Sequence, residues 1–205
     1  MMGKRVICNT CFKALPACIC SMIKSLDNLH FLHILQDPSE QKKALGTARI
    51  LALSLQKCKI TVGVKFDPSL FDLNNTYLLF PSEDAIAATD VYQDPSLVID
   101  NNSQFILLDG SWKKAYKLLM SNTFLQDLPK ISINVNETSR YRIRKSPRED
   151  GLSTVEAGYY LLSQLADDND KFKPLLGCFD YMIDYQISCM PAGTYQHNYL
   201  NKEKD

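Results

Sequence analysis

The sequence predicts an α/β fold built on a mostly parallel β-sheet. From residue 29 to residue 166, short apolar segments that end in turn residues alternate with segments whose apolar residues recur at helical spacing. Continuous apolar runs such as residues 105–108 are typical of strands that are buried on both faces of a parallel sheet. Strands that alternate with helices in this way form layered α/β domains.

The first half of this pattern contains one strand-helix unit and two further strands. A strand is predicted over residues 29–35, and Asp37-Pro38-Ser39 supplies the turn that ends it. Helical spacing of apolar residues then runs from 44 to 55. The next two strands are predicted over 59–65 and 76–80.

A carboxylate lies where the strand predicted over 104–108 runs into a helix. Gly110 permits a tight turn, and Ser111 is of a residue type favoured at helix N-caps. The helix then presents an apolar face at i, i+3, i+4 and i+7, made up of Trp112, Ala115, Tyr116 and Leu119. Because ligands of open α/β sheets bind just beyond the carboxyl ends of strands, Asp109 is the first candidate for chemistry.

The second half of the chain adds a strand, a basic segment and a helix. Apolar residues alternate through 131–135 as in a strand, and a helix is predicted from about 155 to 166. From residue 181 onward the sequence is only weakly periodic, and no element is predicted there.

Composition narrows the classes of function. A chain of 205 residues with 45% hydrophobic content can form one full domain and a small appendage. Lys plus Arg and Asp plus Glu are equal at 23 each, so a basic surface for nucleic acid must come from local clustering. The sequence has no pattern of a signal peptide or membrane span, which predicts a cytoplasmic protein without a membrane partner.

The N-terminal residues 1–28 differ in composition from the domain predicted over 29–205. They carry four cysteines in the spacing C-x2-C-x6-C-x-C, namely Cys8, Cys11, Cys18 and Cys20. Two close thiolate pairs separated by a loop can wrap one tetrahedral zinc ion, and four protein ligands make such a site structural. The alternatives are four unrelated thiols or a redox pair, but the second cysteine pair does not fit a thioredoxin-like unit.

Ser153 and Glu156 have the spacing of a capping box at the start of the last predicted helix. The structural reading is a simple helix cap. The functional reading is that the same helix N-terminus, with Thr154, faces a carboxylate or phosphate of a ligand. The two readings are compatible.

A cluster of cations precedes this cap. Residues 140–148 contain five cations, and Arg142 and Arg144 would project from one face if the preceding strand continued. The plain reading is a solvated surface. The functional prediction is a contact with the phosphates of RNA, made by Arg140, Arg142, Arg144 and Lys145.

Three smaller features have a structural reading, and two of them also have a functional one. Arg49, which follows Thr47, could bind a carboxylate in bidentate fashion or could be an ordinary surface arginine. Phe80-Pro81-Ser82 is a strand end and a turn, and taken alone it is structural. Trp112 fits a core position, but beside Asp109 it could also form the wall of a ligand pocket.

Together and in this order, these motifs resemble the DTW-domain family, the tRNA-uridine aminocarboxypropyltransferases, named for an Asp-x-Thr-Trp motif. The resemblance runs from about residue 8 to residue 162. It rests on Cys8, Cys11, Cys18 and Cys20, Thr47 with Arg49, Phe80-Pro81-Ser82, Asp109-Gly110-Ser111-Trp112 with Ala115, Tyr141-Arg142-Ile143-Arg144, and Ser153-Thr154-Val155-Glu156-Ala157. Ser111 stands where the family usually has Thr and retains the hydroxyl.

The resemblance implies a knotted, SPOUT-like α/β fold with an N-terminal zinc ribbon of four cysteines. It also implies transfer of the 3-amino-3-carboxypropyl group of S-adenosylmethionine to N3 of a tRNA uridine, in the variable loop for bacterial members. The weakly acidic N3–H requires a base, and Asp109 is the expected one. The residues expected around the donor are Thr47, Arg49, Phe80, Pro81, Ser82, Leu108, Gly110, Ser111, Trp112, Ser153, Thr154 and Glu156.

Two rival functions remain at this point. An RNA methyltransferase would use the same donor with the methyl carbon presented to the nucleophile. A non-catalytic RNA-binding protein would use the zinc ribbon and the basic segment alone. The expected partners are tRNA and S-adenosylmethionine, and a monomer is the expected state.

Overall fold

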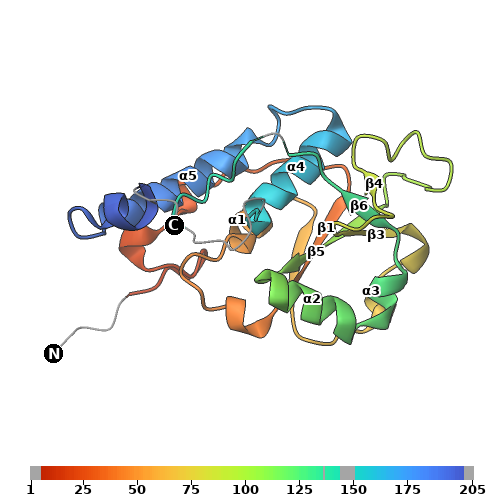
Figure 1. Ribbon diagram of the computed structural model, residues 1–205, viewed down its shortest axis with the longest axis horizontal. Helices are drawn as coiled ribbons and strands as arrows, with labels where there is room; N and C mark the ends of the chain where they lie inside the picture. Colours follow the sequence, from red (N-terminus) through yellow and green to blue (C-terminus); the bar gives the residue numbers. More distant parts are fainter. Residues whose placement is uncertain (1–5, 136, 144–150, 201–205) are drawn as a thin grey trace.

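A single parallel sheet forms the centre of the computed structural model, which describes residues 6–135, 137–143 and 151–200 (Figure 1). In this part of the chain six strands pair in the order β2-β1-β5-β3-β6-β4, and every pairing is parallel. Their bounds are β1 Phe31–Gln36, β2 Cys58–Val62, β3 Thr76–Leu79, β4 Ile86–Ala87, β5 Gln104–Asp109 and β6 Lys130–Ser132. The predicted α/β fold with a mostly parallel sheet is confirmed.

Helices cover both faces of the sheet. α1, α4 and α5 pack on one face, whereas α2 and α3 lie on the other (Figure 1). Their bounds are α1 Ala48–Ser54, α2 Trp112–Ser121, α3 Thr123–Asp127, α4 Thr154–Ala166 and α5 Lys173–Ser188. No helix among the described residues has both the length and the apolar character needed to cross a bilayer.

The side-chain alternation of the strands divides the core into two halves. Phe105 and Leu107 of β5 belong to the cluster under α1, α4 and α5, whereas Ile106 belongs to the cluster under α2 and α3. All three are almost fully buried. Because both faces of β5 are buried, its sequence is a continuous apolar run.

Several elements are shorter than the sequence predicts, among them β2, which ends at Val62 and not at residue 65. α1 begins at Ala48 and not near residue 44, because Pro38–Glu40 forms a 3₁₀ turn and the following residues form further turns. β6 ends at Ser132 and not near residue 135, because its partners β3 and β4 end at Leu79 and Ala87 and offer no ladder beyond that point.

Among the α-helices and strands of the described residues, α3, α5 and β4 were not predicted from the sequence, and α5 is the longest of them. The buried residues of α5 recur at i, i+3, i+4, i+7 and i+8, namely Leu175, Cys178, Phe179, Met182 and Ile183, so a periodic signal was present in the sequence. Pro174 in the first turn was a second signal. α3 and the two-residue strand β4 are too short to give a periodic pattern.

The predicted apolar face of α2 is only partly correct. Ala115 and Leu119 are buried, but Tyr116 is 57% exposed, and Leu118 is buried in the core under α2 and α3 instead. The helix begins at Trp112 after Ser111, which occupies the N-cap position without a side-chain capping bond.

The N-terminal segment shares the core under α1, α4 and α5. Cys11 and Ile19 are 3% and 0% exposed and belong to that cluster. The two short 3₁₀ helices of the segment, Leu15–Ala17 and Cys20–Met22, contact α5. The stability of this segment and of the main sheet is therefore coupled through one set of apolar contacts.

Two glycines provide a test of the packing between α1 and α4. An added Cβ at Gly158 would lie 2.7 Å from both Cδ atoms of the fully buried Leu51, whereas a Cβ at Gly177 of α5 meets nothing within 4 Å. Gly158→Ala should destabilise the protein, because overpacking costs about 2 kcal/mol and helix propensity returns about 1. Gly177→Ala should stabilise it by about 1 kcal/mol. Urea unfolding of both variants measures the difference, and equal effects would contradict this packing.

Candidate functional site

A cavity of about 610 Å³ lies at the carboxyl ends of β3, β5 and β6, beside the N-termini of α2 and α4. Apolar and hydroxyl side chains line it, together with the acidic side chain of Glu137. Seven of the residues expected around the donor are in its lining: Phe80, Pro81, Leu108, Gly110, Trp112, Ser153 and Thr154. These residues come from three separate segments of the chain, and the fold brings them to one edge of the sheet.

The lining also contains residues that sequence reasoning missed. Residues 133–135 and 137–139, which follow β6, contribute Ile133, Val135, Glu137, Thr138 and Ser139. Because β6 ends at the same edge as β5, the position of this segment after a parallel strand was the signal that could have identified it.

The other residues expected around the donor molecule lie outside the lining of the cavity. Thr47 is buried and accepts a hydrogen bond at Oγ1 from the backbone N–H of Val155, at 3.4 Å, so it contacts the first turn of α4. The Arg49 guanidinium lies 4.3 Å from the ring centroid of Phe12 in the N-terminal segment. Ser82 follows the cavity residue Pro81 in an exposed turn.

The Asp109 carboxylate is buried behind the cavity wall. Gln36 Nε2 donates to Asp109 Oδ2 at 2.7 Å, and Thr154 Oγ1 donates to Asp109 Oδ1. Leu108 and Gly110 line the cavity on either side of it, and Thr154 is the lining residue that contacts the carboxylate directly. The Thr154 hydroxyl thus connects the cavity to Asp109.

Burial makes Asp109 a stronger base than an ordinary aspartate. Its pKa is raised, mainly by desolvation, although the hydrogen bonds from Thr154 and Gln36 oppose the shift. A carboxylate with a raised pKa accepts a proton more readily, which is the property that general-base chemistry needs.

Glu156 is buried behind the wall of the cavity and holds two segments of that wall together. It forms the predicted capping box with Ser153, whose backbone N–H donates to Glu156 Oε2 at 2.8 Å. The same carboxylate accepts hydrogen bonds from the backbone N–H of Arg140 at 2.6 Å and from the Ser139 hydroxyl at 3.0 Å. Protein donors thus surround the Glu156 side chain, and it joins the start of α4 to the segment that lines the opposite part of the cavity.

Replacing Glu156 with Gln should therefore loosen two segments together. The amide would set an N–H group against a ring of donors, and each buried group left unsatisfied costs about 1–3 kcal/mol. We expect a lower Tm and faster amide hydrogen exchange at residues 139–143 and at the first turn of α4. Glu83→Gln, at an exposed position, is the matched control. Unchanged exchange at both segments in the Glu156 variant would show that its carboxylate does not hold them.

The basic segment does not continue the sheet. Residues 140–143 form a bend and a turn, so the expected strand with two arginines on one face is wrong for this part. Arg140 pairs with Asp180 at 2.9 Å and Arg142 with Asp184 at 2.7 Å, both on α5. Arg144 and Lys145 lie outside the described residues. The prediction that these cations bind RNA stays a prediction.

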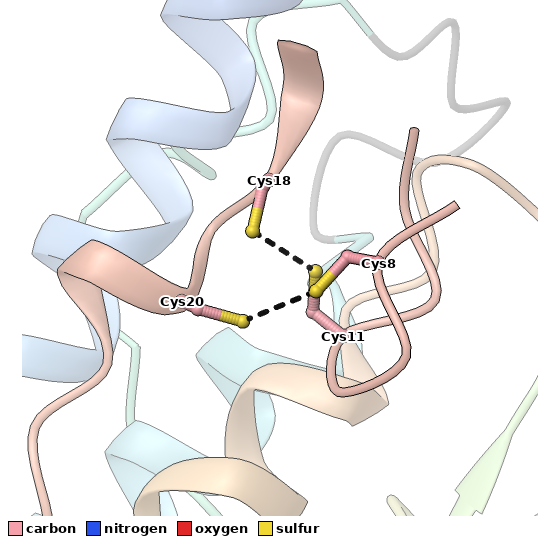
Figure 2. A group of neighbouring side chains, drawn as sticks. All are labelled: Cys8, Cys11, Cys18 and Cys20. Carbon is pink, nitrogen blue, oxygen red and sulfur yellow. Dashed lines mark hydrogen bonds between the residues drawn. The ribbon is translucent and has the colours of Figure 1, made fainter. Parts of the chain in front are cut away.

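The four N-terminal cysteines converge on one point (Figure 2). Cys8 and Cys20 approach at 3.7 Å between sulfurs, as do Cys11 and Cys18, and all four sulfurs lie within 4.8 Å of one another. A tetrahedral site with Zn–S bonds of about 2.3 Å has sulfur separations of about 3.8 Å. The cluster therefore fits a zinc ion held by four thiolates.

Lys13 connects this cluster to the loop before α1. Its ammonium is buried and donates to the carbonyl oxygens of Ala44 at 2.6 Å and Gly46 at 3.5 Å. That loop leads directly to Thr47, which contacts the start of α4. The cysteine cluster and the wall of the cavity are thus linked through a short series of polar contacts.

Comparison with known proteins identifies the family of the chain. The DTW domain matches residues 5–187, from just before the cysteine cluster to the end of α5. The chain belongs to the DTW family. No solved structure matches it.

Three curated relatives of the chain share a name. Two proteins named "tRNA-uridine aminocarboxypropyltransferase 2" are similar to the chain over 90% of its length, at 28% identity in Macaca fascicularis and 26% in Mus musculus. A Drosophila melanogaster protein of the same name is 26% identical over 95% of the chain and 79% of its own length. The chain spans 64% of the length of the macaque and mouse relatives.

Proposed function

We propose that this DTW protein transfers the 3-amino-3-carboxypropyl group of S-adenosylmethionine to N3 of a uridine in the variable loop of tRNA. The observation that carries the proposal is the cavity at the carboxyl edge of the sheet, where the family motifs meet around a buried carboxylate. The names of the relatives supply the reaction and the tRNA substrate.

The cavity has the chemical character that this donor requires. The Trp112 and Phe80 rings lie edge to face at 6.1 Å between centroids and offer apolar surface to the adenine. Ser153, Thr154 and the N-terminus of the 13-residue helix α4 offer hydroxyls and a positive dipole end to the amino-acid carboxylate. The donor would thus extend from the aromatic wall toward α4.

The transfer needs a proton acceptor next to the nucleophile. In the proposed step, N3 of uridine attacks the methylene carbon next to the sulfonium, the carbon–sulfur bond breaks, and its electron pair returns to sulfur. The N3 proton passes to the Thr154 hydroxyl while that hydroxyl gives its own proton to Asp109, with which it is already hydrogen-bonded. Methylthioadenosine leaves as the neutral by-product.

The proposal also covers the metal, the fold of the domain, the oligomeric state and the expected donor-site residues outside the cavity lining. Zinc at Cys8, Cys11, Cys18 and Cys20 would hold residues 1–28 as a structural head on a domain of residues 29–205. The domain would be a knotted, SPOUT-like fold, and the protein would act as a monomer in the cytoplasm. Thr47, Arg49, Ser82, Ser111 and Glu156, which lie outside the cavity lining, would shape the donor site through the segments that carry them.

Mass analysis of modified nucleosides tests the reaction. The purified protein is incubated with unmodified tRNA and S-adenosylmethionine, and the RNA is digested and analysed. Uridine carrying an aminocarboxypropyl group is the expected product. A methylated uridine would mean that the donor presents its methyl carbon, and tRNA binding without any product would mean a binding protein.

A further inference from the structure

An exposed basic surface lies beside the cavity, on α2 and on the loop after β1. We call it the α2 basic surface. It consists of Lys43, Lys113, Lys114, Lys117 and Tyr116, together with Lys42, the exposed neighbour of Lys43 in the same loop. The segment after β1 runs alongside the start of α2 (Figure 1), and Glu40 joins the two, because its Oε1 lies 2.8 Å from both Lys43 Nζ and Lys114 Nζ.

This surface carries a local excess of positive charge in a chain with no net charge. Lys43 and Lys114 pair with Glu40. Hydrogen bonds from Ser39 lower the pKa of Asp37, and the charges of Lys114 and Lys117 lower it further. Among the residues that the structure describes, no ion pair involves Lys42, Lys113 or Lys117. In contrast, Arg140 and Arg142 are already paired with carboxylates of α5. The α2 basic surface is therefore better suited to an external polyanion.

Tyr116 adds an aromatic group next to these cations. It is 57% exposed and lies one helical turn after Trp112, which lines the cavity. Met120, one turn further along, is 50% exposed on the same side of α2. Exposed aromatic rings among lysines are suited to single-stranded nucleic acid, since a base stacks on the ring and phosphates meet the cations.

We propose that the α2 basic surface binds the RNA strand next to the reacting uridine. Lys42, Lys113 and Lys117 contact its phosphates, and Tyr116 stacks on a neighbouring base. The position beside Trp112 then lets the target base enter the cavity while the backbone stays on α2. This inference rests on the proposed tRNA substrate and names the part of the protein that holds it.

The test compares tRNA binding by two variants with equal loss of charge. One combines Lys42→Ala, Lys113→Ala and Lys117→Ala. The control combines Lys24→Ala, Lys59→Ala and Lys171→Ala, at three exposed lysines outside the α2 basic surface. Binding to unmodified tRNA is measured by filter retention at several salt concentrations, together with S-adenosylmethionine binding by calorimetry.

The α2 triple variant should bind tRNA at least about tenfold more weakly, and the slope of log affinity against log salt should fall by about two. Tyr116→Ala should weaken binding about tenfold and leave the salt slope unchanged, because stacking releases no counterions. Donor binding should match the wild type in both. Affinity and salt slope equal to those of the control in the α2 triple variant would overturn the proposal, as would a wild-type protein that does not bind tRNA.

These readouts do not depend on turnover, so the two proposals fail separately. Lysine-dependent tRNA binding without aminocarboxypropyl product would support the surface and reject the reaction. Product formation with an unchanged KM for tRNA in the α2 triple variant would reject the surface and support the reaction.

Discussion

Asp109→Asn should lower the rate of aminocarboxypropyl transfer by about 10²–10⁴-fold, the usual contribution of a positioned general base. Asn keeps the shape of the side chain and can still accept a hydrogen bond from the Thr154 hydroxyl or from Gln36, the two donors to the carboxylate. It cannot take up a proton. Donor binding should therefore be retained while turnover is lost, and single-turnover assays with calorimetry of the donor separate the two.

The pH dependence of the wild-type rate should follow from the same carboxylate. Asp109 acts as a base only when it is ionised, so the rate should rise as pH increases through its pKa. Because burial raises that pKa, the rise should lie at a higher pH than an exposed aspartate would give. The rise should be absent in Asp109→Asn, and a wild-type rate in that variant would exclude the role.

As pH rises through the pKa of Asp109, the stability of the fold should fall while the rate of transfer rises. The folded-state pKa of Asp109 lies above the unfolded value, so its contribution to stability is present below the unfolded pKa and is lost as pH rises through the folded pKa. Above the folded-state pKa the ionised carboxylate thus disfavours folding. At such a pH Asp109→Asn should have a Tm at least equal to that of the wild type, because the Thr154 hydroxyl can rotate to accept a hydrogen bond from the new amide N–H. Asp90→Asn, at an exposed position, controls for the loss of one charge.

The local features of the sequence predicted much of the site. Asp109 stands at a strand-to-helix junction that parallel topology places at a ligand-binding edge, and the capping box at Ser153 is a contact within one helical turn. The cysteine cluster could likewise be predicted, because its four sulfurs come from a segment of thirteen residues. In each case the spacing along the chain determines the geometry.

Contacts between distant segments could not be predicted in the same way. Arg140 and Arg142 pair with residues 40 and 42 positions further along, on α5, a helix that was not predicted. The placement of Arg49 against Phe12 depends on how the N-terminal segment packs on the domain. A single sequence without known packing gives the charge of such residues but not their partners.

If the four cysteines hold a zinc ion, as we propose, its removal should destabilise the whole protein and not only the N-terminal segment. Cys11 and Ile19 are part of the core that α5 closes, and Lys13 holds the loop that leads to Thr47. If the ion contributes about 4 kcal/mol at the zinc concentration used, chelation should lower Tm by roughly 8–16 °C for a chain of this size.

Two cysteine variants make this expectation specific to the cluster. Cys18→Ser should start with a lowered Tm and low zinc content, and chelator should shift it little further. Cys189→Ser, at an exposed cysteine outside the cluster, should behave as the wild type. Transfer activity should fall with zinc content, because the contacts from Lys13 through the loop to Thr47 and α4 would loosen. Purified protein that contains no zinc and keeps its Tm in chelator would show that the four thiols stabilise the fold without a metal.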